Sequence, residues 1–174
     1  MATEVKGVKE LRYALRNFEP DLAKETQKEI AGFLKPIVQK SRNLIPNVSP
    51  LSGWRPRAFS EGRWPNWDTN RARRGITYKT TPTRPNSRGF SYAASLHNKS
   101  AVGAIYERAG VNPSAGKKSS RPNFAKALGS LEGSGRLRGR AMFAVLNRDQ
   151  GRVNAAVMKA LTNAADKFNS RRGA

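Results

Sequence analysis

One segment of the chain, residues 54–74, limits where helices, strands and the hydrophobic core can form. It reads WRPRAFSEGRWPNWDTNRARR and holds every tryptophan of the protein together with six arginines. Pro56, Gly62 and Pro65 interrupt helical and strand hydrogen bonding, so we expect an irregular surface loop across residues 47–75. The core must therefore come from the segments on either side.

Apolar residues at helical spacing flank this loop. One stripe predicts a short N-terminal helix and consists of Val8, Leu11, Leu15 and Phe18. Pro20 suits the first turn of a second, long helix that ends by Pro46, and we expect a kink at Pro36. A last stripe predicts a C-terminal helix and consists of Val153, Val157, Leu161, Ala164 and Phe168.

Between these helices, alternation with a period of two predicts two short strands. Ile76 and Tyr78 alternate with polar neighbours, and a clearer run, with one buried face, covers residues 90–97. The turn-rich residues between them favour an antiparallel pair joined by an extended basic loop. Helical spacing returns at residues 102–109, whereas the apolar run at 140–146 fits a helix or a strand.

These elements predict a single α+β domain over residues 1–174. N-terminal helices, the second long and kinked, and a C-terminal helix are expected to pack on a small antiparallel sheet, with long basic loops. The helical N-terminal part covers 1–46, the Trp/Arg-rich loop 47–75, and the sheet with the C-terminal helices 76–174. At 174 residues one compact domain buries about 70% of its unfolded surface.

Positive charge dominates the chain and is unevenly placed. The net charge is +21, with 9 Lys/Arg against 6 Asp/Glu in residues 1–50 and 24 against 6 beyond them. Such a surface favours an anionic partner, and both nucleic acid and acidic protein surfaces meet that need. No stretch approaches 18 apolar residues, so we expect no membrane span.

The residue inventory argues against an enzyme. There are no cysteines, and His97, the single histidine, falls on the polar side of a predicted strand. The carboxylates beyond residue 50 are scattered through different elements, which disfavours a two-metal site. We therefore expect no catalytic residues, no metal and no cofactor. Glu107 is expected to be exposed, or else to pair with one of the arginines.

The Trp/Arg-rich loop is the strongest candidate for a contact site, because tryptophan and arginine are common interface anchors. The proposed protein-interface residues are Trp54, Arg55, Arg57, Arg63, Trp64, Trp67, Arg71, Arg73 and Arg74. Two other interpretations stay open. The tryptophans could cap the core while the arginines stay solvated, or they could stack on unpaired bases while the arginines bind phosphates.

The order of the segments resembles a known family. An opening GVKELRYALRNF helix leads to a long helix with KPIVQKSRNLIP, followed by PLSG, strands, AIYERAG, a loop, RPNFAKAL and a terminal amphipathic helix. This order is similar to the tail-completion or neck proteins of long-tailed bacteriophages. The chain departs from the common family pattern at Arg108-Ala109-Gly110, where many members have Gly-Thr, and in a longer Trp/Arg-rich stretch.

The resemblance implies a structural virion protein. The expected form is a homo-oligomeric ring, hexameric, at the head–tail junction, assembled in the bacterial host cytoplasm. Its expected partners are the head–tail connector, tail terminator or tail tube proteins, with non-specific contact to DNA in the channel. The alternative is a basic protein that binds nucleic acid without sequence preference.

Overall fold

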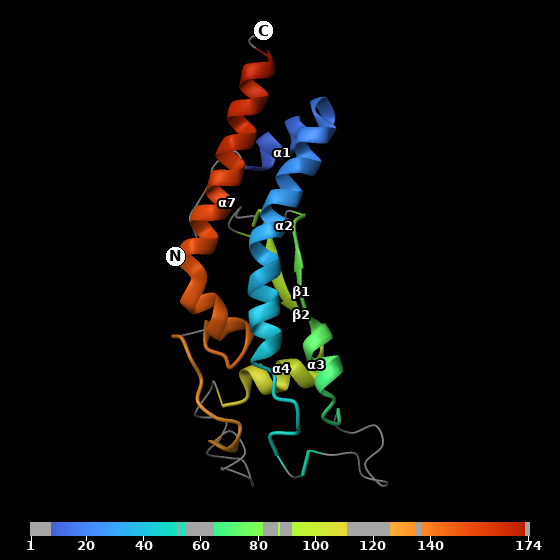
Figure 1. Cartoon of the computed structure of the whole chain (residues 1–174), viewed down its shortest axis with the longest axis vertical. Helices are drawn as coiled ribbons and strands as arrows, with labels where there is room; N and C mark the ends of the chain where they lie inside the picture. The colour runs from blue at the N-terminus through green and yellow to red at the C-terminus, as the bar shows by residue number, and fades with distance from the viewer. Residues whose placement is uncertain are drawn as a thin grey trace. The chain divides into compact units, whose positions relative to one another are not determined.

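A computed structural model describes residues 8–51, 53–54, 65–81, 87, 92–110, 126–134 and 137–172 (Figure 1). Within them the named elements follow in the order α1 (Val8–Phe18), α2 (Pro20–Asn43), α3 (Thr69–Gly75), β1 (Ile76–Lys79), β2 (Ser95–Asn98), α4 (Ala101–Arg108) and α7 (Met142–Arg172). The predicted α+β class is confirmed, with N-terminal helices, a small antiparallel sheet, and α2 packed against α7.

The chain divides into two compact units. Unit 1 comprises residues 1–36, 78–96 and 150–174, and unit 2 comprises residues 37–77 and 97–149. Helices α2 and α7 each contribute one part of their length to each unit, and so do both strands. The expectation of a single domain stays a prediction.

The core of unit 1 lies between α1, α2 and the C-terminal part of α7. It consists of Leu15, Leu22, Ala164 and Phe168, with Leu11, Ala14 and Ala23 packed against them. The stripe prediction holds for Leu15 but is wrong for Phe18, which ends α1 and is 61% exposed. Two ion pairs link α2 and its preceding residue to α7, Lys167 with Glu25 and Arg171 with Glu19, each at 2.6 Å.

Helix α2 begins at Pro20 as predicted, with Asp21 in its first turn. Proline is well placed there, because the first turn of a helix leaves its amides without intrahelical partners. The helix continues through Pro36 to Asn43. The kink at Pro36 stays a prediction.

Unit 2 has a separate core that is rich in small and branched side chains. Its buried residues include Ile37, Val38, Ile45, Ala72, Ile76, Val102, Ala141, Ala144 and Val145. The undecided run at 140–146 is helical from Met142 onward, because α7 begins there. The C-terminal helix thus starts 11 residues earlier than the predicted stripe at Val153. Small alanines allow its first turns to pack closely.

The sheet is smaller than predicted. Strand β1 matches the predicted strand, whereas β2 covers only Ser95–Asn98. Phe90 lies outside the described residues, and Tyr92 precedes the strand and is 52% exposed. All four β2 residues are half-buried, so the expected buried face of this strand is not present.

The prediction of an irregular segment over residues 47–75 is wrong for its last seven residues, which form α3. Asp68 caps this helix, and its side chain accepts a hydrogen bond of 2.8 Å from the Arg71 amide. An aspartate at this position satisfies an amide that the first turn leaves unpaired. Ala72 and Gly75 are buried, so the helix is held by close packing rather than by an apolar stripe.

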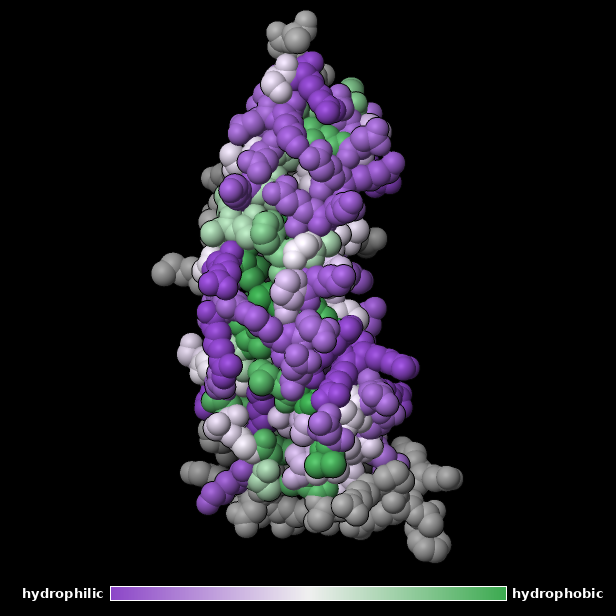
Figure 2. All heavy atoms as spheres, in the orientation of Figure 1, coloured by the Kyte–Doolittle hydropathy of each residue, from purple (hydrophilic) through white to green (hydrophobic). Residues whose placement is uncertain are grey.

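Hydrophilic residues cover most of the described surface that Figure 2 presents, with hydrophobic atoms visible in narrower patches. Among the described residues, no helix has both the length and the apolar character needed to cross a bilayer.

Candidate interaction site

Three aromatic rings of unit 2 form a cluster. The Trp54 and Trp67 ring centroids are 5.0 Å apart at a tilt of 59°, and Trp67 meets Tyr106 edge-on at 5.7 Å. Such tilted and edge-to-face pairs are favourable beyond their buried area. The cluster joins the Trp/Arg-rich segment to helix α4, which carries Tyr106.

Hydrogen bonds fix both indoles in this cluster. The Trp54 Nε1–H donates to the Pro65 carbonyl at 2.8 Å, and the Trp67 Nε1–H donates to Thr69 Oγ1 at 2.9 Å. Thr69 Oγ1 in turn lies 2.9 Å from the Asn47 carbonyl. Both tryptophans are half-buried, so these contacts agree with the core-capping interpretation for the two described tryptophans.

Of the other seven predicted interface residues, the structure describes Arg71, Arg73 and Arg74, and these three do not share one set of contacts. Arg55, Arg57, Arg63 and Trp64 lie outside the described residues. Arg73 donates to the Ile45 carbonyl at 2.8 Å and to the Asn47 side chain at 2.7 Å. It thus links α3 to the segment that follows α2. Arg71 and Arg74 are exposed. The interface role of the nine residues stays a prediction.

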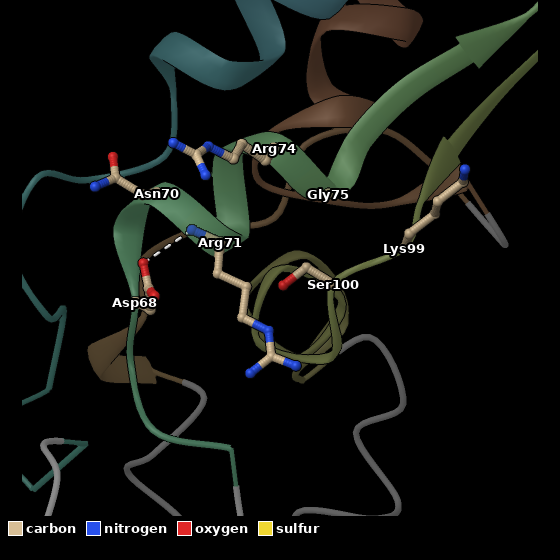
Figure 3. Close-up of a pocket in the computed structure, with 7 residues that line it drawn as sticks. All are labelled: Asp68, Asn70, Arg71, Arg74, Gly75, Lys99 and Ser100. Atoms are coloured by element: carbon tan, nitrogen blue, oxygen red, sulfur yellow. Dashed lines mark hydrogen bonds between the residues drawn. The ribbon is translucent and has the colours of Figure 1, made fainter.

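An open hollow of about 430 Å³ lies beside α3 and the start of α4 (Figure 3). It is lined by Asp68, Asn70, Arg71, Arg74, Gly75, Lys99 and Ser100. In Figure 3 the Arg71 side chain extends past the start of α4, while Arg74 and Lys99 point in two other directions. The hollow is therefore lined by polar and charged residues, and its cations are spread apart.

Close backbone packing builds this hollow. The Lys99 amide donates to the Gly75 carbonyl at 2.9 Å, and Ser100 caps α4 by accepting from the Gly103 amide at 3.2 Å. A Cβ at Gly75 would come within 2.8 Å of the Ser100 nitrogen, which is closer than side chains tolerate. Glycine at position 75 is therefore required for α3 and α4 to approach.

A buried carboxylate lies deeper in unit 2. Glu107 is 1% exposed, and its oxygens accept hydrogen bonds from the amides of Ala141, Met142 and Phe143 at 2.9, 3.0 and 2.8 Å. These amides begin α7, where the helix dipole favours negative charge. The preferred expectation that Glu107 is exposed is wrong. Three backbone hydrogen bonds offset the cost of removing its carboxylate from water.

Whereas Glu107 binds backbone amides, two arginines nearby bind backbone carbonyls. Arg140 is 7% exposed and donates to the carbonyls of Tyr106, Ala109 and Gly129 at 2.8 to 3.0 Å. Burial lowers the pKa of Arg140, while Tyr106 and Glu107 act in the opposite direction. Arg108 donates to the Arg138 carbonyl at 2.8 Å, and its guanidinium lies 5.3 Å from the centre of the Phe143 ring.

The charged side chains at this junction therefore connect separate backbone segments by binding their amides and carbonyls. Glu107 joins α4 to the start of α7, and Arg140 joins the start of α7 to the end of α4. Sequence reasoning considered Glu107 but preferred an exposed position for it, and it did not single out Arg140, although AIYERAG and the RGRAM at the start of α7 place charged residues beside apolar ones. No group of three or more His, Cys, Asp or Glu side chains within the described ranges is placed to hold a metal ion.

The chain matches no protein-family model, no curated protein and no solved structure. The likeness to phage neck proteins therefore rests on the sequence segments quoted above.

Proposed function

We propose that this protein is a structural, non-catalytic subunit of a tailed phage, a ring-forming neck or tail-completion protein that joins the tail tube to the head connector. The observation that carries the proposal is the link between AIYERAG and the terminal helix. AIYERAG forms most of α4, and its Glu107 binds the first amides of α7. A motif behind the resemblance thus contributes directly to the packing of unit 2.

The use of charge in unit 2 supports a structural role. Asp68 and Glu107 bind backbone amides, Glu132 pairs with Arg148, and Asp149 pairs with Lys40 at 2.7 Å. All four described carboxylates of this unit thus hold parts of the fold together. A general acid or base must instead face a substrate.

Exposed apolar side chains support contact between copies. Val48 is 74% exposed and Leu44 is 37% exposed, and both lie in the stretch that leads from α2 towards the aromatic cluster. Surfaces that another protein covers expose apolar side chains in the free subunit, most clearly where these form a patch. We assign Leu44 and Val48 to the contact between neighbouring copies in the ring.

The proposal is tested by particle composition and by assembly. Purified particles of the parent phage should contain the chain at a fixed ratio to the tail tube protein, measured by quantitative mass spectrometry. A phage lacking the chain should accumulate heads and tails that do not join, and the intact chain supplied in trans should restore joining. Its absence from purified particles would exclude the proposed function.

The ring contact has its own test. Leu44→Asp with Val48→Asp should abolish the oligomer seen by native mass spectrometry with partner proteins present. Tyr13→Asp, at a 70% exposed position of α1 in unit 1, is the matched control and should leave the oligomer intact. Equal effects of the two changes would contradict the assignment of this contact.

A further inference from the structure

Three cations beside the hollow have no role in the described fold. They are Arg71, Arg74 and Lys99, which we name the α3–α4 basic face. We propose that this face binds the phosphate backbone of double-stranded DNA without sequence preference. The inference depends on this surface alone, so it holds whether or not the chain belongs to a virion.

The three cations are available for a ligand. Their side chains are exposed, and no hydrogen bond or ion pair among the described residues uses their charged groups. Other arginines of unit 2 differ, since Arg42 donates to the Ile76 carbonyl at 2.8 Å and Arg73 to the Ile45 carbonyl. Binding at the basic face therefore breaks no described contact of the fold.

The surrounding carboxylates neutralise this face only in part. Asp68 lies on the rim and caps α3 by accepting a hydrogen bond from the Arg71 amide, and its negative charge offsets one of the three cations. Glu107 is buried, and Glu132 and Asp149 pair with other cations. The described part of unit 2 holds eleven Lys and Arg against four Asp and Glu, so excess positive charge remains there. A field of this kind attracts polyanions.

The arrangement of the cations favours an extended anion. In Figure 3 the three side chains fan out from the hollow instead of converging on one point. A single small anion needs convergent donors, whereas a nucleic-acid strand presents phosphates in a row. Ser100 and Asn70 lie on the same rim, and hydroxyl and amide groups commonly add neutral donors to phosphate contacts.

The lining favours a charged ligand. All seven lining residues are polar, charged or glycine, so the hollow offers no aromatic or aliphatic side chain as an anchor, and its positive side chains are the groups left to bind an anion. Single-strand binding uses free ring faces for base stacking. Among the described rings of the aromatic cluster, Trp54 packs on Trp67 and Trp67 also packs on Tyr106, so this cluster favours duplex over single strands.

The test measures binding of the full chain to a labelled duplex of about 25 base pairs by fluorescence anisotropy, over a salt series. The site variant combines Arg71→Ala, Arg74→Ala and Lys99→Ala. The control removes the same charge from exposed lysines of unit 1 and combines Lys28→Ala, Lys35→Ala and Lys159→Ala. Circular dichroism checks that both variants are folded. A second control, Arg71→Lys with Arg74→Lys, keeps the positive charge of the basic face.

The site variant should raise the Kd at least about tenfold at ~0.1 M salt and reduce the log–log salt slope by about 2 to 3, since each phosphate contact contributes about 0.9. The control and the lysine pair should change the Kd by less than about threefold. Equal losses in the site and control variants would overturn the proposal, and so would no binding by the unaltered chain at ~0.05 M salt.

Two further probes exclude other ligands. Poly-glutamate should bind more weakly than the duplex and lose less affinity in the site variant. Tighter binding of poly-glutamate, with the same loss, would assign the face to acidic protein and overturn the DNA proposal. Single-stranded DNA that binds tighter than duplex and quenches tryptophan fluorescence would overturn it as well.

Discussion

The Glu107 carboxylate accepts a hydrogen bond of 2.8 Å from the backbone amide of Phe143, a residue 36 positions later in the chain. With the bonds from Ala141 and Met142, this carboxylate satisfies three amides at the start of α7. A carboxylate is thus buried at a helix end whose dipole stabilises it. Glu107 is thus a central contact of the junction of α4 and α7, alongside Arg140.

Glu107→Ala should lower the free energy of unfolding by about 3 kcal/mol or more, because three buried amides lose their acceptor. Glu107→Gln keeps one acceptor oxygen and should cost about 1 to 2 kcal/mol. Urea unfolding followed by tryptophan fluorescence measures both, since Trp54 and Trp67 lie in the same unit. Glu132→Ala, which removes an exposed ion pair, is the control and should cost less than about 1 kcal/mol. Equal costs would contradict this role of Glu107.

Gly139→Ala should destabilise the protein by about 1 to 3 kcal/mol, because the added Cβ would overlap Glu107 Oε1 and come within 2.8 Å of Phe143 Cβ. Gly151→Ala is the matched change within α7. Nothing lies within 4 Å of its added Cβ, so the helix should gain about 0.5 to 1 kcal/mol. Thermal unfolding by circular dichroism distinguishes the two, and a stabilising Gly139→Ala would contradict the close packing described here.

Trp67→Ala should cost about 3 kcal/mol in the isolated protein, because it removes the ring that contacts both Trp54 and Tyr106. Trp67→Phe keeps an aromatic ring but loses the bond to Thr69, and should cost about 1 kcal/mol. Chemical unfolding of the monomer measures both. A side chain that served only contacts between subunits would leave monomer stability unchanged in both variants.

Alkaline pH should weaken unit 2 through Tyr106. Burial raises the pKa of its phenol, Glu107 acts in the same direction, and Arg140 partly opposes them. The unfolded chain therefore ionises first, near the ordinary 10.0, so this contribution is present below that pH and is lost as pH rises through the folded value. Tyr106→Phe should flatten the fall in stability above pH 10.0. Parallel curves for the variant and the unaltered chain would rule out this effect.

Acid should weaken unit 1 through Glu25. The hydrogen bond and charge of Lys167 lower the pKa of Glu25 below its ordinary 4.5. The stabilisation is therefore present above pH 4.5 and is lost as pH falls through the lower folded value. Carbon-detected NMR titration should show the Glu25 pKa returning towards 4.5 in Lys167→Ala. An unchanged titration in that variant would remove Lys167 as the cause.

Periodicity predicted the long helices and β1, because their signals are local. Leu15 and Phe168 are buried where the stripes placed them. Helix α3 was missed because TNRARRG carries no apolar stripe, and its only cue was Asp68 at the cap position. A cap is a weak signal in a segment crowded with proline and arginine.

The candidate site was less accessible to sequence reasoning. The burial of Glu107 depends on amides 34 to 36 residues away, and no pattern around AIYERAG specifies that partner. The tryptophans were recognised as important, but composition alone does not separate a ring that packs inwards from one that faces a partner. Of the three arginines of that segment that the structure describes, the fold uses Arg73 and leaves Arg71 and Arg74 exposed.

The excess of positive charge in unit 2 makes association depend on ionic strength. The described part of the unit carries eleven Lys and Arg against four Asp and Glu, so copies of it repel one another in dilute buffer. Added electrolyte screens that repulsion and should promote self-association, while the same ions displace a bound polyanion. One variable, the concentration of simple salt, thus drives the two kinds of association in opposite directions.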